Sequence, residues 1–180
     1  MLRQLLALAL LAAATPAFAA PWPAPLAPTI TATDGYVPIS HPAVAPDKTR
    51  TYRFVVNVTR AGKTPDAPAM GVLQAGDTIN TLRAGGVPMD HIQVVLAFHD
   101  AALDSILSEE AYKAKHGVMN PNLPIMDSLK RHGVHLFVCG QNLAADNVDP
   151  KTLTPLVTIA ADALVVLVTY QNRGYALLSF

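Results

Sequence analysis

Short apolar runs rich in β-branched residues recur along the chain, and segments with helical spacing of apolar residues separate them. The runs are bounded by glycine, proline or polar residues, which is typical of buried strands. They predict strands at 51–59, 91–98, 134–138, 156–160 and 175–179. Helices are expected at 67–84, 101–107, 109–115, 124–133, 141–147 and 161–173.

This alternation of strands and helices, joined by short connections, predicts an α/β fold. We expect a three-layer domain with a mostly parallel five-stranded sheet and helices on both faces. The nearly continuous apolar centre of the first strand, residues 54–58, agrees with this, because a parallel strand is covered on both faces.

The segment 161–173 is the ambiguous one. Its valines favour a strand, because β-branched side chains are enriched in strands. Asp162 is a good helix N-cap, however, and Gly174 is a good helix stop. We therefore expect a helix here.

The first 19 residues have the pattern of a cleaved secretory signal. Arg3 precedes an apolar run from Leu5 to Ala14, which is too short to span a membrane, and Ala17-Phe18-Ala19 matches a small-x-small cleavage site. We expect cleavage after Ala19 and export, with the periplasm as the location.

Residues 20–50 are expected to form an extended arm ahead of the folded domain at 51–180. Prolines lie at positions 21, 23, 25, 28, 38, 42 and 46. Proline has no N–H and fixes φ, which excludes a helix or a central strand. The usual looseness of chain termini favours a mobile arm. The alternative is an arm held against the domain by Trp22 and Tyr36.

Charge and cysteine content narrow the classes of function. Without Arg3, 12 basic and 13 acidic residues remain, so there is no field to attract nucleic acid. The one cysteine, Cys139, has no partner for an internal disulfide. It is an inert buried thiol, a reactive thiol or an intermolecular bridge. No dinucleotide-binding glycine motif or P-loop is present, and we expect no cofactor.

The candidate site lies where two predicted strands end. Cys139 follows one strand and His99 follows another, and Gly140 allows a sharp turn after the cysteine. Ligands of parallel α/β sheets bind at the carboxyl ends of strands. We therefore predict a crevice with Cys139 as the catalytic thiol, and with His99, Gly140, Gln141 and Asn142 in binding roles.

Two histidines near the cysteine at first suggest a metal site. His132 and His135 precede Cys139 closely, but His135 is about 13 Å from Cys139 along an extended strand. They cannot share one ion without a bend, so we expect no metal within one subunit. A site between subunits that uses His91 or His116 stays open.

Short motifs follow one another in order along residues 51–180. They are Phe98-His99, Asn120 with Leu123 and Ile125, Gly133-Val134, Val138-Cys139-Gly140-Gln141 and Gly174-Tyr175-Ala176. In combination they resemble the DsrE/DsrF-like superfamily. The resemblance implies a compact α/β domain that often assembles into trimers, hexamers or other oligomers.

In the sulfur-relay members of that family a cysteine carries a persulfide between proteins, and Cys139 matches the family's strand-end cysteine. The first hypothesis is therefore an exported sulfur carrier or sulfurtransferase that uses Cys139 as its persulfide site. It would be a homo-oligomer, with a sulfur-donor or sulfur-acceptor protein as partner and no membrane span.

The alternative hypothesis is a non-catalytic, oligomeric binding module of the same fold with an inert Cys139. The sequence offers no complete acid–base or nucleophile–base set, so enzymatic activity stays open. A third hypothesis is a metal-binding protein built on the histidines.

Overall fold

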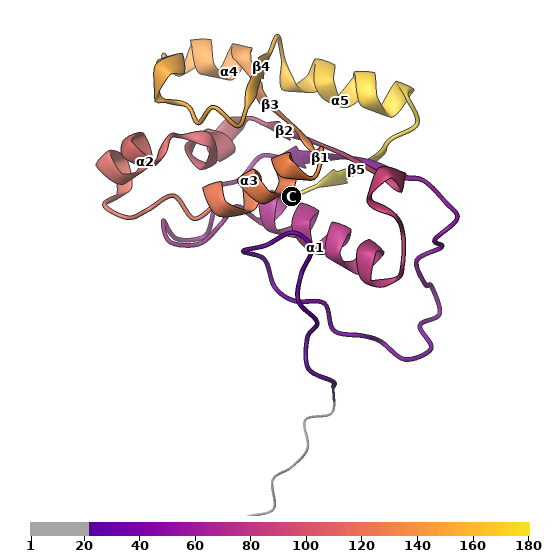
Figure 1. Ribbon diagram of the computed structural model, residues 1–180. Coiled ribbons are helices and arrows are strands. Elements are labelled where there is room, and N and C mark those ends of the chain that lie inside the picture. Colours follow the sequence, from indigo (N-terminus) through magenta and orange to yellow (C-terminus); the bar gives the residue numbers. More distant parts are fainter. Residues whose placement is uncertain (1–21) are drawn as a thin grey trace, which may run out of the picture.

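The protein is described here by a computed structural model that covers residues 22–180 (Figure 1). The predicted signal segment, residues 1–19, lies outside the described residues. The strands are β1 (Tyr52–Val58), β2 (Ile92–Phe98), β3 (His135–Cys139), β4 (Thr158–Ala160) and β5 (Ala176–Ser179). The α-helices are α1 (Met70–Ala84), α2 (Glu109–His116), α3 (Leu123–Arg131), α4 (Gly140–Ala145) and α5 (Ala163–Asn172). Short 3₁₀ helices are η1 (Met89–His91), η2 (Asp100–Ile106) and η3 (Pro150–Thr152).

The strands form one five-stranded sheet in the order β4-β3-β2-β1-β5, and every pairing in it is parallel. The predicted α/β fold is thereby confirmed. From β1 to β4 the chain steps along the sheet in one direction, and it then crosses back to place β5 beside β1. Because such crossovers are right-handed, the reversal sends α5 to the face opposite α1 and α3 (Figure 1).

The two faces of the sheet are covered unequally. The larger core cluster joins one face of the strands to α1 and α3. The smaller cluster, on the opposite face, joins Val55, Val95, Ala97 and Cys139 to α5. One ten-residue helix therefore covers the central strands on this second face.

Local sequence explains the helices that the predictions left in doubt. The Asp162 carboxylate accepts a hydrogen bond of 2.7 Å from the Leu164 N–H, so it caps α5, and the helical prediction for 161–173 is confirmed. Gly71 lies in α1 because a β-carbon there would come within 2.9 Å of a Val58 methyl group. The glycine thus lets α1 approach β1 closely.

Two buried asparagines fasten the start of α1 to the loop before α3. The Asn122 side chain accepts 2.7 Å from the Ala69 N–H, and its own amide group donates 2.9 Å to Asn120. The Asn120 amide group donates to the carbonyls of Ser105 and Leu107. Each asparagine therefore supplies partners to main-chain groups that water cannot reach.

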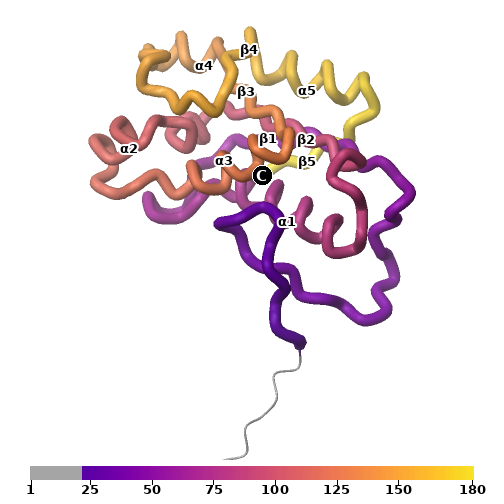
Figure 2. The backbone as a smooth tube through the Cα atoms, viewed as in Figure 1, coloured from indigo at the N-terminus to yellow at the C-terminus, as the bar shows by residue number. Residues whose placement is uncertain are grey.

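The arm does not trail from the domain. It runs beneath α1, on the side away from α5 (Figure 2), and Ile30 is fully buried there. The expectation that Trp22 anchors the arm is wrong, because Trp22 is 63% exposed. Tyr36 instead lines a cavity between the arm and α1.

Among residues 22–180, no helix has both the length and the apolar character needed to cross a membrane.

Replacing Asn122 should destabilise the domain. In Asn122→Ala the buried Ala69 N–H loses its acceptor, so the free energy of unfolding should fall by about 1–3 kcal/mol. Urea denaturation followed by circular dichroism measures this. Asn172→Ala, at an exposed position of α5, is the matched control and should leave the midpoint unchanged. Equal midpoints for Asn122→Ala and wild type would contradict this account of the loop.

Candidate functional site

The carboxyl ends of β2 and β3 place the two predicted site residues side by side. Phe98 pairs with Val138 in the parallel register, so the next residues, His99 and Cys139, occupy neighbouring positions at the same sheet edge. His99 and Cys139 therefore lie at the same edge of the sheet, as the sequence predicts. Their side chains, however, contact different partners.

Cys139 lies beneath α5 and not at the lip of an open groove. The residue is 3% exposed and packs in the smaller core cluster with Ala163, Val166 and Leu167. Its Sγ lies 3.8 Å from Asp162 Oδ1, to which the thiol donates. The sequence predicts a crevice with Cys139 as its catalytic thiol, but in the structure apolar side chains and a carboxylate surround the sulfur.

Asp162 connects this thiol to the start of α5. The same oxygen, Oδ1, accepts from the Leu164 N–H and from the Cys139 thiol. The carboxylate that caps the helix therefore also closes the space above the sulfur. Nucleophilic cysteines have cations or helix N-termini beside them. Cys139 is the N-cap residue of α4, but its side chain makes no capping hydrogen bond, and the polar neighbour of its sulfur is the Asp162 carboxylate.

The three residues after Cys139 have separate surroundings. Gly140 sits so close to β4 that a β-carbon would come within 2.7 Å of the Ala160 carbonyl oxygen. It also lines a cavity of about 290 Å³ beside α4. Gln141 donates from Nε2 to the Ala161 carbonyl at 3.3 Å, and Asn142 Oδ1 accepts 3.4 Å from the Asp100 N–H. Asn142 thus serves the segment after β2 and not the sulfur.

His99 is engaged by polar partners on both sides of its ring. Its Nε2 lies 2.6 Å from Asn57 Oδ1, and its Nδ1 lies 3.1 Å from Asp100 Oδ2. The Asn57 amide group in turn donates 3.1 Å to Ser179 Oγ. With both ring nitrogens occupied, His99 is not the base that would activate Cys139.

The polar row Ser179–Asn57–His99–Asp100 runs along the carboxyl edge of β5, β1 and β2. Sequence reasoning missed Asn57 and Ser179 as site residues, because only the pairing of β1 with β5 brings them together. Asp100 has a φ of 52°, a left-handed conformation that is uncommon outside glycine. Such strain concentrates at functional sites, and the hydrogen bond from its N–H to Asn142 helps to hold it.

The histidines do not converge on a metal. His132 is bonded through Nδ1 to the Ser128 carbonyl, and His116 lies 3.1 Å from the Asp104 carboxylate. His135 stacks on Phe137 with ring centroids 6.2 Å apart. Within residues 22–180 no three His, Cys, Asp or Glu side chains form a group that could hold a metal ion.

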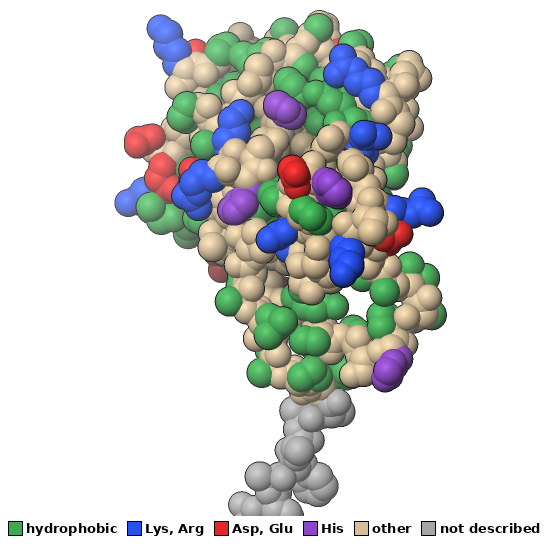
Figure 3. Space-filling model, turned by 45° about the vertical axis from the view of Figure 1, so that its right-hand side comes forward, with side chains coloured by type: hydrophobic (Ala, Val, Ile, Leu, Met, Phe, Trp, Pro, Cys, Tyr) green, Lys and Arg blue, Asp and Glu red, His purple; other side chains and the backbone are tan. Residues whose placement is uncertain are grey.

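Charges of both signs are interspersed over the face shown in Figure 3. On that face no broad region of one sign stands out that would steer a polyanion or a membrane surface to the protein. The polar row presents hydrogen-bonding groups at the carboxyl edge of the sheet. The Cys139 thiol is paired with the Asp162 carboxylate beneath α5 and not with the His99 imidazole.

Comparison with known proteins agrees with the fold. The model of the DsrE/DsrF-like family matches residues 53–180. A solved structure of a protein of unknown function, MTH1491 from Methanobacterium thermoautotrophicum, is similar with a TM-score of 0.52 and 17% identity. The match covers 72% of this chain and 99% of that one. No curated protein matches the chain.

The burial of Cys139 predicts slow alkylation of the folded protein by iodoacetamide at neutral pH, and fast alkylation in urea. Asp162→Ala should speed the native reaction, because it removes the carboxylate above the sulfur. It should also cost about 1 kcal/mol of stability through loss of the helix cap. Intact mass against time measures the reaction.

Ser108→Ala is the matched control, since Ser108 caps α2 through the Ala111 N–H. It should not change the alkylation rate. If native Cys139 reacts as fast as in urea, the thiol is accessible and this description of the site is wrong.

Proposed function

Because this chain belongs to the DsrE/DsrF-like family, we propose that it acts as a non-catalytic, oligomeric binding module of that fold. In this proposal Cys139 is a structural thiol. The observation that carries it is the burial of Cys139 beneath α5 with a carboxylate as its polar neighbour. The carboxyl edge then serves recognition and not covalent chemistry.

The polar row is the surface that we propose for binding. Ser179 is exposed, the Asp100 side chain is 61% exposed, and Asn57 joins them through His99. These groups offer an alternating set of donors and acceptors at the edge where α/β sheets bind ligands. A small polar ligand or a partner's exposed segment could bind there.

The outer face of α5 supports the proposed self-assembly. Leu164, Val165 and Val168 are 59%, 57% and 56% exposed, although a helix with apolar residues on all sides is usually buried. Leu177 on β5 adds a further exposed apolar side chain. The occupant that we propose for this face is a second copy of the chain, in keeping with the oligomers that the family resemblance implies.

Polar substitutions on this face should weaken assembly. We expect the wild-type mature chain to be larger than a monomer by light scattering after gel filtration. The double variant Leu164→Glu/Val168→Glu should shift towards the monomer, because charges placed in an apolar interface lose their hydration. Lys113→Glu, an added negative charge at an exposed position of α2 away from this face, is the control and should assemble normally. A wild type that stays monomeric at every concentration would contradict the proposed interface.

Sulfur carriage by Cys139 is the second candidate. The observation in its favour is the position of Cys139 at the end of β3, directly before α4, which is where the family resemblance places the persulfide cysteine. Asp162 and the start of α5 would have to move aside before the sulfur meets solvent. The Cys139 thiolate would attack the outer sulfur of a polysulfide or persulfide donor. The new S–S bond would form as the donor's S–S bond breaks, and the donor would leave as a thiolate or shorter polysulfide anion.

Incubation with polysulfide followed by intact mass separates the two candidates. Binding-module function predicts no adduct on the native protein. Sulfur carriage predicts a gain of about 32 Da, one sulfur atom, that dithiothreitol removes and Cys139→Ser abolishes. An adduct that survives in Cys139→Ser would arise elsewhere and would remove the support for carriage.

We also propose that the protein works in the periplasm, as the leader pattern of residues 1–19 suggests. A lone thiol outside the cytoplasm is exposed to oxidants, and burial beneath α5 would protect it.

A further inference from the structure

A socket between α1 and α3 holds the N-terminal arm. We call it the arm socket, and it consists of Gly76 and Asn80 on α1 with Ile125 and Ser128 on α3. Ile30 fills it and is fully buried, in a segment that lies outside the region matched by the family model.

Two buried polar side chains of the socket bind the arm's main chain. The Asn80 side chain accepts 2.7 Å from the Ile30 N–H and donates 3.3 Å to the Ile30 carbonyl. It also donates 2.8 Å to the Thr33 hydroxyl. Ser128 Oγ accepts 3.0 Å from the Thr31 N–H. Over residues 22–180, every hydrogen bond of these two side chains goes to the arm, so a released arm would leave both polar groups without these partners.

Two glycines, one in α1 and one directly after it, also allow the arm to approach closely. A β-carbon on Gly76 would lie 2.6 Å from a Thr33 methyl carbon, and one on Gly85 would lie 2.5 Å from Pro46. Both positions would clash with the docked arm if they carried a side chain. The helix therefore gives up helical propensity at Gly76 and gains close contact with the arm.

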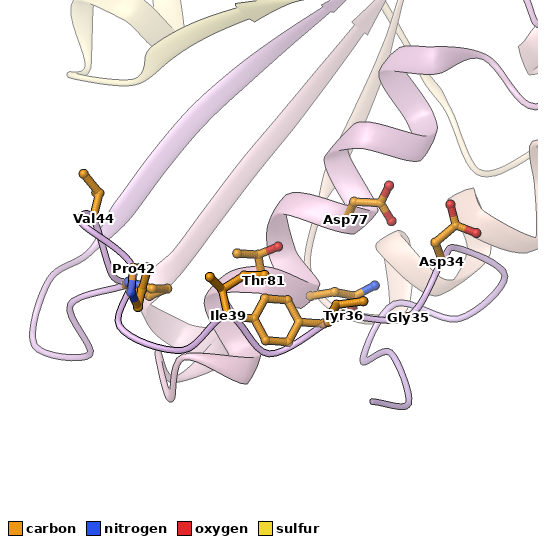
Figure 4. A pocket seen from close by; sticks show the side chains of 11 residues that line it. Asp34, Gly35, Tyr36, Ile39, Pro42, Val44, Asp77 and Thr81 are labelled. Carbon is orange, nitrogen blue, oxygen red and sulfur yellow. The ribbon is translucent and has the colours of Figure 1, made fainter. Parts of the chain in front are cut away.

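One feature opposes docking. Asp34 on the arm and Asp77 on α1 lie near each other at one end of a cavity of about 420 Å³ between the arm and the helix (Figure 4). Asp77 Oδ1 is buried and has no hydrogen-bond partner in the described part of the chain. Two carboxylates that face each other without a cation repel when both are ionised.

The charged groups of the neighbouring elements do not neutralise this pair. On α1, the Arg83 guanidinium donates to the Val87 carbonyl. On α3, Arg131 is paired with Asp127. Within residues 22–180, no salt bridge reaches Asp34 or Asp77.

We propose that residues 28–34 form a detachable strap seated in the arm socket, and that the negative charge of Asp34 and Asp77 loosens it. Proton uptake at Asp77 then tightens docking. The strap's hydrogen bonds and its isoleucine stabilise the docked state. The two carboxylates make the docking equilibrium depend on pH. The inference does not depend on the proposed function of Cys139 or of the polar row.

The sign of the effect follows from linkage. Burial raises the pKa of Asp77, the Asp34 charge raises it further, and the Thr33 hydrogen bond lowers it. The docked state therefore binds the proton more tightly than the released state. Docking is strongest below the ordinary aspartate pKa, weakens as pH rises through the raised pKa of Asp77, and is weakest at neutral pH.

Hydrogen exchange at single residues tests the strap in the whole mature protein. The probes are the amides of Ile30 and Thr31, which are bonded to the arm socket, and the Val95 amide in the sheet reports global folding. After correction for intrinsic exchange, wild-type protection at Ile30 and Thr31 should rise from neutral to mildly acidic pH. The gain should be at most about tenfold per unit by which docking raises the pKa.

Substitutions test whether Asp77 and Asp34 cause the pH dependence of protection. Asp77→Asn should increase protection at neutral pH and remove its pH dependence, and Asp34→Asn should reduce that dependence. Asp146→Asn, an exposed carboxylate at the end of α4, is the matched control and should behave as wild type. Ile30→Ala should lose protection at both amides at every pH while Val95 stays protected.

Three results would overturn the proposal. One is wild-type protection that is equal at both pH values. Another is an Asp77→Asn variant that is protected no better than wild type at neutral pH. The third is tightening of the wild type by added Ca²⁺ at neutral pH that Asp77→Asn abolishes, which would assign the pair to a metal ion instead of a proton.

Discussion

A single helix, α5, has to cover the second face of the sheet. This requirement determines both the surroundings of Cys139 and the exposed apolar side chains of the helix. The chain steps in one direction from β1 to β4, so the three connections between these strands place their helices on one side, and only the return to β5 supplies α5 to the other. That helix must bury Val55, Val95 and Cys139 with its inner side chains. Asp162, which starts the helix, consequently lies over the sulfur, and the helix's outer valines are left facing solvent.

The register of β2 and β3 places Cys139 and His99 next to each other at one sheet edge, but their side chains have separate partners. Cys139 and His99 are neighbours in register, yet the sulfur turns to Asp162 and the imidazole to Asn57 and Asp100. The hydrogen bond at Nε2 and the Asp100 carboxylate beside Nδ1 occupy both sides of the imidazole, so neither ring nitrogen is left for the thiol. The edge therefore carries a polar row suited to recognition, beside a thiol that is packed as a small apolar side chain.

The arm shows how a segment without regular secondary structure can still be specified. Its prolines exclude a helix, but the buried amide of Asn80 and the hydroxyl of Ser128 select one docked position for Ile30 and Thr31. In the proposed strap, the charges of Asp34 and Asp77, which line one cavity, act against that position. A segment held by a few specific bonds and opposed by charge repulsion is suited to reversible movement.

The α/β class, the order of the elements and the carboxyl edge as the place for Cys139 and His99 can all be predicted from the amino-acid sequence. The reason is that the spacing of apolar residues and the glycine or proline boundaries of each element are local properties. The sequence also makes Cys139 the only thiol. Three features become visible only in the folded chain: α5 covers the sulfur, Asn57 and Ser179 join His99, and Ile30 rather than Trp22 holds the arm. These outcomes depend on which distant segments pair and on which face each helix lies, and no local pattern encodes that choice.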